Sequence, residues 1–344
     1  MKATVWKGAG RMKIENLPTP TIGAREVLIK VKATGICGSD LTIFQGKFHK
    51  HRAIPPMVLG HEFSGDIVEI GKEVKHDLNV GDRVFVDPLI PCGECYACRE
   101  GSSHVCSTLK LIGIDIDGAF AEYVKASADR VYLLPERLTY EEGCVVEPLA
   151  VAVHAVRRAQ TKVGDAVLVV GGGPVGVLIA LVAICAGANP VVITEIQDYR
   201  TGLAETLGIK VVNPLIPGAL SDSMKNDFAG IGPNIAFEVT GTEQGTQQSI
   251  DCVRIRGTVV QVGAPKGNTD LDVRKGNFAE LSIVGSRVYG PADIQIAINL
   301  LATGKFSVTS LYQTFPFEEC SKVFQQIIAG DCNLMKPVIL PPKS

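Results

Sequence analysis

The sequence lacks any concentration of positive charge. Its 344 residues carry 34 lysines and arginines against 36 aspartates and glutamates, and both signs are mixed along the chain, giving a net charge of −2. Proteins that bind nucleic acid through its phosphates carry a basic patch or stripe, so we expect no nucleic-acid partner. Internal repeats and low-complexity tracts are missing too, so nothing indicates a repeat architecture.

The N-terminal stretch MKATVWKGAGRMKIENLP lacks the apolar core of a secretory signal. We therefore expect a cytoplasmic protein. The ten cysteines of the chain then indicate metal binding or catalysis before disulfide bonds, because the cytosol keeps thiols reduced.

Charge is completely absent between residues 166 and 194. This run is long enough for a membrane-spanning helix, but three consecutive glycines and Pro174 divide it into short pieces. Near-continuous apolar runs of this kind are typical of strands buried in a parallel sheet. We therefore expect a strand, a glycine turn, a helix and a second strand here, and no membrane span.

The length of the chain and its 46% of apolar residues suit two domains. Up to about residue 150, Val27, Ile29 and Val31 alternate with more polar neighbours, and Gly and Pro recur at short intervals, which predicts a barrel-like β-domain. Strands and helices then alternate as in a doubly wound parallel sheet, which places the chain in the α/β class. We expect strands at 166–170, 190–195, 235–241, 257–264 and 281–286, and helices at 174–186, 197–208, 292–303 and 318–329.

The run GGGPVG, residues 171–176, fits the pattern G-x-G-x-x-G, follows an expected strand and opens an expected helix. Glycine allows a sharp turn and the close approach of a pyrophosphate to the helix N-terminus, so the run predicts a dinucleotide site. The alternative is a glycine turn of an ordinary α/β fold. Within the run we expect five residues at the cofactor: Gly171, Gly173, Pro174, Val175 and Gly176.

The next expected strand ends at Glu195. A carboxylate there accepts hydrogen bonds from both ribose hydroxyls and repels a 2′-phosphate, which favours NAD over NADP. Arg200 lies close enough in the sequence to weaken that preference. Three residues in the last part of later expected strands are further expected cofactor contacts: Thr240, Val262 and Gly263.

Four cysteines stand close together in the polar segment PCGECYACREGSSHVC, with the spacing C-x2-C-x2-C-x7-C. Tetrahedral zinc takes four thiolates, and short spacings let one loop surround the ion. Because so polar a segment cannot order itself by burial, we expect zinc to supply the free energy. The alternatives are an iron–sulfur cluster, whose usual spacing differs, and disulfides. The predicted ligands of this structural zinc are Cys92, Cys95, Cys98 and Cys106.

Four more residues with metal-binding side chains are dispersed. Cys37 lies in GICGSD, His61 and Glu62 lie in GHEFSGDIVEIG, and Glu147 lies in EPLAVAVHA. A catalytic metal site needs fewer protein ligands than a closed one and an open position. Each residue alone also fits an ordinary buried or helix-terminal side chain, so the residues by themselves leave the question open.

Over essentially its whole length the chain resembles the medium-chain, zinc-dependent alcohol dehydrogenase family. The resemblance rests on GHEFSGDIVEIGKEV (60–74), on GDRV (81–84), on the four-cysteine segment and on the glycine run, all in the family's order. It implies a GroES-like catalytic domain, formed by residues 1–150 and 288–344. It also implies an NAD-binding Rossmann domain, formed by residues 151–287.

Within that family, VVEPLAVAVHAVRRA (145–159) is similar to the polyol branch of sorbitol, butanediol and threonine dehydrogenases. Glu147 stands where other alcohol dehydrogenases place a cysteine ligand. The resemblance implies Cys37 and His61 as ligands of a catalytic zinc, with Glu62 and Glu147 ligating directly or through water. It further implies Ser39 as the proton-relay hydroxyl and Asp40 as the carboxylate that orients the zinc histidine.

Some positions depart from the family pattern. Thr42 stands where many members have the histidine that passes the proton to solvent; His49 and His51 lie nearby and are candidates for that role. Arg287 lies near the position where sorbitol dehydrogenases bind substrate hydroxyls. The complete cysteine set is missing in mammalian sorbitol dehydrogenases, which favours the bacterial enzymes. For the five other cysteines we expect buried thiols: Cys144, Cys185, Cys252, Cys320 and Cys332.

The implied function is an NAD-dependent dehydrogenase of a secondary alcohol, a polyol or vicinal diol such as sorbitol or L-iditol, with two zinc ions per chain. The implied assembly is a homodimer or homotetramer. Alternatives are L-threonine 3-dehydrogenase, 2,3-butanediol dehydrogenase, a zinc-free quinone or enoyl reductase, and a zinc-stabilised nucleotide-binding protein without turnover.

Overall fold

The computed structural model describes residues 1–48, 52–75, 77–265 and 267–342. The chain divides into two compact units, Met1–Glu147 with Ile298–Ser344, and Pro148–Ala297. Two helices continue from one unit into the other, α3 (Tyr140–Arg158) and α9 (Pro291–Ala302). The domain limits predicted from the sequence stay a prediction. In the described part of the chain, no helix combines the length and apolarity needed to cross a membrane.

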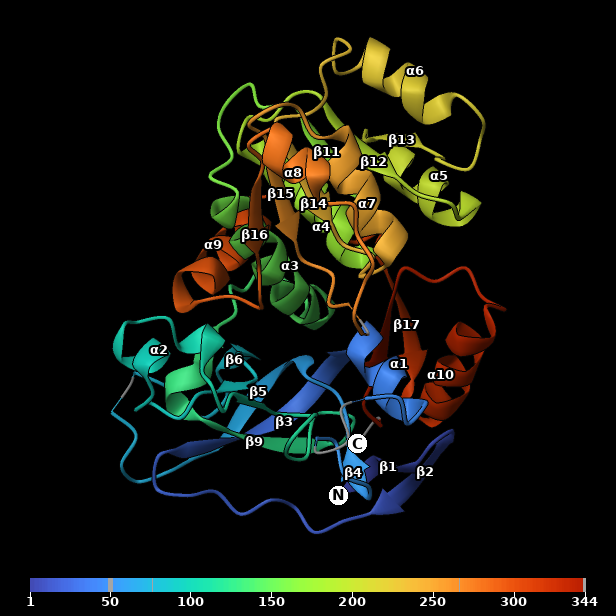
Figure 1. The fold of residues 1–344 in the computed structure, drawn as a ribbon. Coiled ribbons are helices and arrows are strands. Elements are labelled where there is room, and N and C mark those ends of the chain that lie inside the picture. Colours follow the sequence, from blue (N-terminus) through green and yellow to red (C-terminus); the bar gives the residue numbers. More distant parts are fainter. Residues whose placement is uncertain (49–51, 76, 266, 343–344) are drawn as a thin grey trace. The chain divides into compact units, whose positions relative to one another are not determined.

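The first unit is built on a seven-stranded sheet with the order β10-β6-β5-β3-β18-β17, in which β9 also pairs with β3 (Figure 1). A three-stranded sheet, β2-β1-β4, and a two-stranded sheet, β7-β8, complete it. Its strands are β1 (Lys2–Gly8), β2 (Arg11–Asn16), β3 (Glu26–Gly35), β4 (Met57–Val58), β5 (Glu62–Ile70), β6 (Arg83–Val86), β7 (Leu89–Ile90), β8 (Lys110–Leu111), β9 (Tyr123–Ser127), β10 (Val131–Leu133), β17 (Tyr312–Pro316) and β18 (Lys336–Leu340).

The predicted apolar alternation in β3 places Val27, Ile29 and Val31 in one core cluster, together with Phe63 and Ile67 of β5. β3 and β5 pair antiparallel along most of their length, and Gly35 at the end of β3 lies opposite Glu62 at the start of β5. This register brings the segment after β3 next to the segment before β5. The short helices of this unit are α1 (Gly38–Phe44), α2 (Tyr96–Arg99), η1 (Ser103–Val105), η2 (Ala128–Arg130), η3 (Phe317–Glu319) and α10 (Cys320–Ala329).

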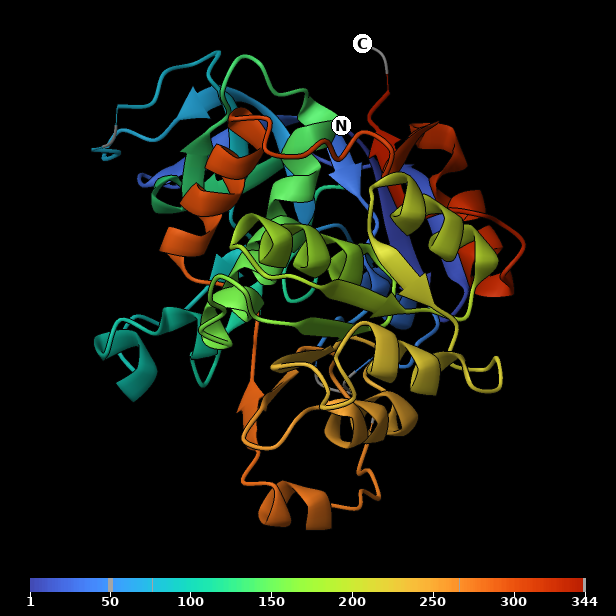
Figure 2. The same cartoon turned by 90° about the horizontal axis from the view of Figure 1, so that it is seen from above.

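The second unit contains a six-stranded sheet with the order β13-β12-β11-β14-β15-β16, and every pair in it is parallel. Helices cover both faces (Figures 1 and 2), so the predicted doubly wound α/β sheet is confirmed. The strands are β11 (Val167–Val170), β12 (Val191–Thr194), β13 (Lys210–Val212), β14 (Ile235–Glu238), β15 (Thr258–Gln261) and β16 (Ser282–Gly285). The helices are α4 (Pro174–Cys185), α5 (Asp198–Thr206), α6 (Ala219–Asn226), α7 (Glu243–Cys252) and α8 (Arg274–Phe278).

The direction of strand order reverses between β11 and β14. In open parallel sheets, ligands bind outside the carboxyl ends of the strands at such a reversal. The uncharged run 166–194 folds as predicted, into β11, a glycine turn, α4 and β12. The glycine turn therefore lies at the edge of the sheet where a ligand is expected.

Candidate active site

The four predicted zinc cysteines gather on one short loop, which we call the cysteine lobe (Cys92, Cys95, Cys98 and Cys106). The Sγ atoms of Cys95 and Cys98 are 3.5 Å apart, those of Cys92 and Cys106 are 3.5 Å apart, and those of Cys92 and Cys98 are 4.0 Å apart. Four sulfurs at about 2.3 Å from a tetrahedral zinc are separated by about 3.8 Å. The same distances exclude disulfide bonds, which need about 2.05 Å. The lobe therefore has the dimensions of a zinc site.

Backbone N–H groups of the lobe point at its sulfurs. The N–H of Cys92 donates to Cys106 Sγ at 3.3 Å, and the N–H of Cys95 donates to Cys92 Sγ at 3.3 Å. Hydrogen bonds from the backbone of Ser107 and Cys98 lower the pKa of the Cys95 thiol to about 6, whereas desolvation and the hydrogen bond with Cys95 raise the pKa of the Cys98 thiol to about 12. Such donors stabilise thiolates, the form of cysteine that binds metal, so the donor set fits zinc.

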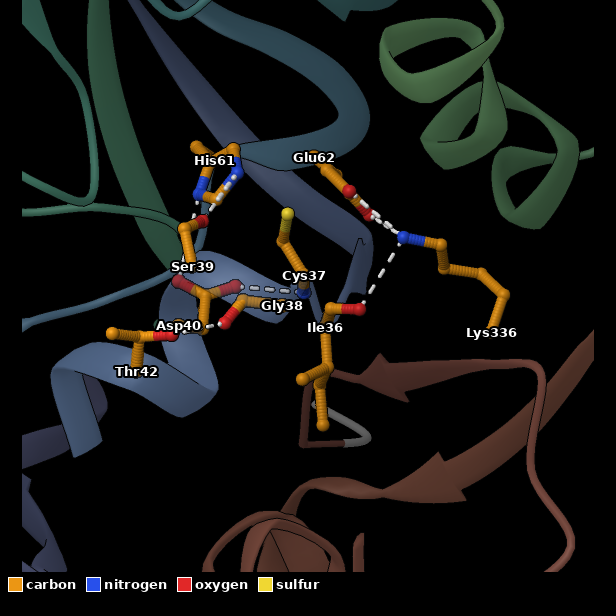
Figure 3. Close-up of polar contacts among 9 residues, drawn as sticks. All are labelled: Ile36, Cys37, Gly38, Ser39, Asp40, Thr42, His61, Glu62 and Lys336. Carbon is orange, nitrogen blue, oxygen red and sulfur yellow. Dashed lines mark hydrogen bonds and ion pairs between the residues drawn. The ribbon is translucent and has the colours of Figure 1, made fainter. Parts of the chain in front are cut away.

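The structure brings three of the dispersed residues together, and we call them the buried group (Cys37, His61 and Glu62). One ligand atom from each lies within 4.8 Å of the others. Figure 3 shows the Cys37 thiol between His61 and Glu62, with the Glu62 carboxylate turned towards Lys336. Cys37 is the N-cap of α1, Glu62 is the first residue of β5, and His61 directly precedes it. A thiol, an imidazole and a carboxylate that converge in this way form a donor set that fits zinc.

Asp40 and Ser39, in the first turn of α1, flank the histidine. The carboxylate of Asp40 is fully buried; its Oδ2 accepts the N–H of Cys37 at 2.9 Å, and its Oδ1 lies 3.5 Å from His61 Nδ1. Ser39 Oγ lies 3.4 Å from His61 Nε2 (Figure 3). Burial lowers the pKa of His61, but the charges of Asp40 and Cys37 outweigh burial and raise it well above its usual value.

Lys336 is the member of this site that the sequence analysis missed. Its Nζ donates to both carboxylate oxygens of Glu62, at 2.6 and 2.8 Å, and to the carbonyl of Ile36 at 3.3 Å (Figure 3). Burial lowers the pKa of Lys336, and the charges of Glu62 and Cys37 more than offset this, so the pKa is raised. The only sign in the sequence is a lysine at the start of the apolar strand KPVIL.

The remaining predicted residues of the first unit take other positions. Glu147 is buried in α3 and lies outside the buried group, although its charge acts on Lys336. The hydroxyl of Thr42 donates to the carbonyl of Gly38 at 3.0 Å, so its proton is already bound within α1. His49 and His51 lie outside the described residues.

In the second unit, the glycine run has the close packing that its pattern predicts. Gly173 is the N-cap of α4, and Pro174 is its first residue. A Cβ atom on Gly176 would lie 1.9 Å from the carbonyl oxygen of Gly171, so only glycine allows α4 to pack this closely on the turn. Gly171 itself has a φ of 108°, a conformation that favours glycine. These features fit a pyrophosphate at the N-terminus of α4.

Glu195 lies beside this turn and is held by backbone groups. Its Oε1 accepts the N–H groups of Ile196 and Gln197, at 2.7 and 2.9 Å, and its Oε2 accepts the N–H of Gly172 at 2.9 Å. Each carboxylate oxygen has two lone pairs, so Oε2 keeps one for a ribose hydroxyl. Arg200 Nη1 is 3.8 Å from the same oxygen. The Glu195 carboxylate, which favours NAD, and the Arg200 guanidinium, which weakens that preference, therefore lie next to each other.

The other expected cofactor residues lie at the carboxyl ends of β14 and β15. A Cβ atom on Gly171 would lie 2.8 Å from Thr240 Cγ2, so the loops that follow β11 and β14 touch. Val262 and Gly263 both donate their N–H groups to the carbonyl oxygen of Glu238, at 2.9 Å each. Arg287, the candidate substrate residue, is exposed in this unit.

The expectation of buried thiols is confirmed for two of the five other cysteines. Cys144 and Cys320 are buried, and burial raises the pKa of both thiols. Cys252 and Cys332 are partly buried, but Cys185 is exposed, because it is the last residue of α4. The buried part of α4 ends at Ala183.

Known proteins match both units. Residues 23–136 match the alcohol dehydrogenase GroES-like domain, and residues 174–303 match the zinc-binding dehydrogenase family. D-xylulose reductase A of Aspergillus oryzae is 36% identical over 95% of this chain and 93% of its own, and sorbitol dehydrogenase of Bacillus subtilis is 33% identical over 99% and 97%. A solved zinc-binding dehydrogenase of Sinorhizobium meliloti, bound to NADP, superposes with a TM-score of 0.92, 31% identity and 99% coverage of both chains.

Proposed function

Because the chain belongs to the family of zinc-binding alcohol dehydrogenases with a GroES-like domain, we propose that it transfers hydride between NAD and a secondary alcohol, a polyol or vicinal diol. We assign zinc binding and substrate activation to residues 1–150 with 288–344, and cofactor binding to residues 151–287. The observation that carries this proposal is the buried group, three converging zinc-type ligands contributed by separate parts of the sequence.

Within the site, each side chain has a defined task. Cys37, His61 and a carboxylate from Glu62 or Glu147 would hold a zinc ion, which supplies Lewis-acid chemistry that lowers the pKa of an alcohol. Asp40 Oδ1, 3.5 Å from Nδ1, is placed to orient His61, and Ser39 Oγ is placed beside Nε2 to accept the proton of the alcohol. Because the hydroxyl of Thr42 already donates to Gly38, the outer path of the proton does not begin there.

The choice of NAD rests on Glu195. A 2′-phosphate next to its carboxylate would be repelled, and the three N–H groups that it accepts hold it in place. Glu195→Ala should weaken NAD binding about tenfold and leave NADP binding nearly unchanged, measured by titration with both reduced cofactors. Equal loss of the two affinities would show that the carboxylate does not select the cofactor.

The substrate is tested with a panel of alcohols in the presence of NAD: sorbitol, xylitol, 2,3-butanediol, L-threonine and simple secondary alcohols. The proposal predicts the highest kcat/KM for a polyol or vicinal diol, in line with the names of two relatives, a sorbitol dehydrogenase and a D-xylulose reductase. If kcat/KM is highest for L-threonine, the second candidate function, threonine dehydrogenase, is supported instead.

Two zinc ions per chain are proposed, one in the cysteine lobe and one in the buried group. Metal analysis of the purified protein tests this number. About two zinc ions per chain agree with the proposal, whereas one ion confined to the lobe, without turnover on any alcohol, would indicate a nucleotide-binding protein.

A homodimer or homotetramer is the proposed assembly. β16 is an edge strand of the six-stranded sheet, and its Ile283 is exposed, as is Phe278 in α8. Exposed edge strands with apolar side chains commonly pair with another chain. Light scattering at micromolar concentration should give a mass of at least two chains, and a monomer mass would contradict the assignment.

A further inference from the structure

Glu238, the last residue of β14, is a fully buried carboxylate that the sequence analysis did not single out. Its Oε1 accepts the N–H of Thr240 at 2.7 Å and the N–H of Gly241 at 3.0 Å, and it also accepts the Thr240 hydroxyl. Its Oε2 accepts Gln261 Nε2 at 2.6 Å. Every one of these donors is neutral: a backbone N–H, a hydroxyl or an amide.

A buried charge is costly unless hydrogen bonds replace its hydration, and this carboxylate has such bonds on both oxygens. The groups around it are all donors, so an acceptor-only side chain matches the site and an amide does not. The charge is therefore matched to its surroundings, and the surroundings are the loops that follow two neighbouring strands.

The carboxylate joins two segments at the carboxyl edge of the sheet, the loop after β14 and the end of β15. Gln261 ends β15, and its Nε2 also donates to the carbonyl of Gly263 at 2.8 Å. A Cβ atom on Gly263 would lie 2.2 Å from the N of Gly241 and 2.7 Å from Glu238 Oε2. The turn after β15 is thus packed directly on the loop after β14, with Glu238 between them.

Thr240 transmits this arrangement to the glycine run. Its hydroxyl is turned inward to Glu238, and its methyl group faces Gly171, where a Cβ atom would lie 2.8 Å away. Because the hydroxyl is held by Glu238, the methyl group of Thr240 is held towards Gly171, at the point between β11 and β14 where the strand order reverses. Thr240, Val262 and Gly263 are expected to contact the cofactor, whereas Glu238 lies behind them.

We propose that Glu238 is a positioning residue for the nicotinamide cofactor: its carboxylate holds the loop after β14 and the turn after β15 in the shape that the cofactor binds. The proposal rests on the proposed function, because it places the dinucleotide at this edge of the sheet. Glu238 makes no contact with the reacting atoms in this scheme, and its effect is on cofactor affinity.

The test is Glu238→Gln in the full-length, zinc-loaded enzyme, with the NADH dissociation constant measured by fluorescence titration. The expected result is a rise of at least tenfold in that constant and in the KM for NAD, with kcat at saturating NAD changed less than threefold and zinc content unchanged. Thr240→Val removes the hydroxyl donor to Glu238 and the acceptor of the Thr242 N–H, but it leaves the backbone bonds to Glu238, so its rise should be smaller, about threefold.

Asp293→Asn is the matched control. Asp293 is a buried carboxylate of the same unit, 2.8 Å from His154 Nδ1, and its loss should lower thermal stability while the NADH dissociation constant stays within twofold of wild type. If Glu238→Gln folds and its NADH dissociation constant also stays within twofold of wild type, the proposal is overturned.

If Glu238→Gln does not fold, Thr240→Val and Gln261→Leu test the same proposal, because each removes a side-chain hydrogen-bond donor to the Glu238 carboxylate. NADH affinities within twofold of wild type in both variants would overturn the proposal. A wild-type enzyme that binds neither NADH nor NADPH would instead refute the proposed function.

Discussion

The cysteine lobe and the buried group both carry ligands suited to a divalent metal ion, but the two groups lie in very different environments. The lobe takes all four ligands from one short segment, and Cys92 is exposed. The buried group takes its ligands from the end of a strand–helix connection and from the start of β5, and its His61 and Glu62 are buried. One site is local and partly exposed, and the other is tertiary and mostly buried.

The difference shows what each site depends on. The lobe needs only its own sulfurs and the N–H groups next to them, so the metal supplies the order that burial cannot. The buried group needs the β3–β5 register, Asp40 and the distant Lys336 before its ligands converge. It therefore exists only after the first unit has folded, and it keeps a buried lysine close to the place of a metal.

The largest expected effect comes from Cys37→Ser, which removes a ligand from the buried group alone. Turnover should fall by at least about a thousandfold, because metal activation contributes several kcal/mol to the reaction. Zinc should drop from about two ions per chain to about one, while NADH still binds. Turnover and metal content measured side by side, with the exposed Cys185→Ser as control, check this. Wild-type turnover in Cys37→Ser would remove the buried group from the reaction.

The second prediction concerns Lys336→Met, which leaves the Glu62 carboxylate buried without its partner. Breaking a buried ion pair costs about 3–5 kcal/mol, so the free energy of unfolding of the zinc-free protein should fall by about that amount in urea titrations. Lys125→Met is the control: Lys125 forms an ion pair with Glu26 at 3.0 Å but is partly exposed, and the loss there should stay within about 1 kcal/mol. Equal losses in the two variants would show that Lys336 has no special role.

The smallest effect on turnover is expected from Cys95→Ser in the cysteine lobe. One zinc ion should be lost, and proteolysis within residues 92–106 should accelerate, because the segment has no apolar core to hold it. The value of kcat should change less than about tenfold. Mass spectrometry of limited digests locates the cleavage, and Ser107→Ala, which keeps the backbone N–H near Cys95, is the control. A collapse of kcat with the buried zinc retained would contradict the separation of the two sites.

The local features could be predicted from the sequence. The spacing of Cys92, Cys95 and Cys98 predicted a compact ligand set, and the glycines at 171 and 176 predicted a turn that a Cβ atom would block. Both depend on neighbours within a few residues. The doubly wound sheet could be predicted for the same reason, since each strand and helix has its own periodicity.

Contacts across the chain could not be predicted in this way. Lys336 and Glu62 are separated by 274 positions, and a lysine at the start of an apolar strand has no periodicity that points to a partner. In the sequence, Glu238 is only a polar residue at the end of an expected strand. The structure shows that Gln261 donates a hydrogen bond to it. The resemblance to the family supplied Cys37, His61 and Glu62, which the residues alone left open.

The position of Lys336 in the last strand of the chain has a consequence for biosynthesis. The ribosome completes the cysteine lobe long before β18, which lies between β3 and β17, has left the exit tunnel. In the proposed two-zinc enzyme, a nascent chain could therefore bind the ion of the lobe early, while Glu62 still lacks its cation. The second proposed ion would reach its final setting only after translation of β18.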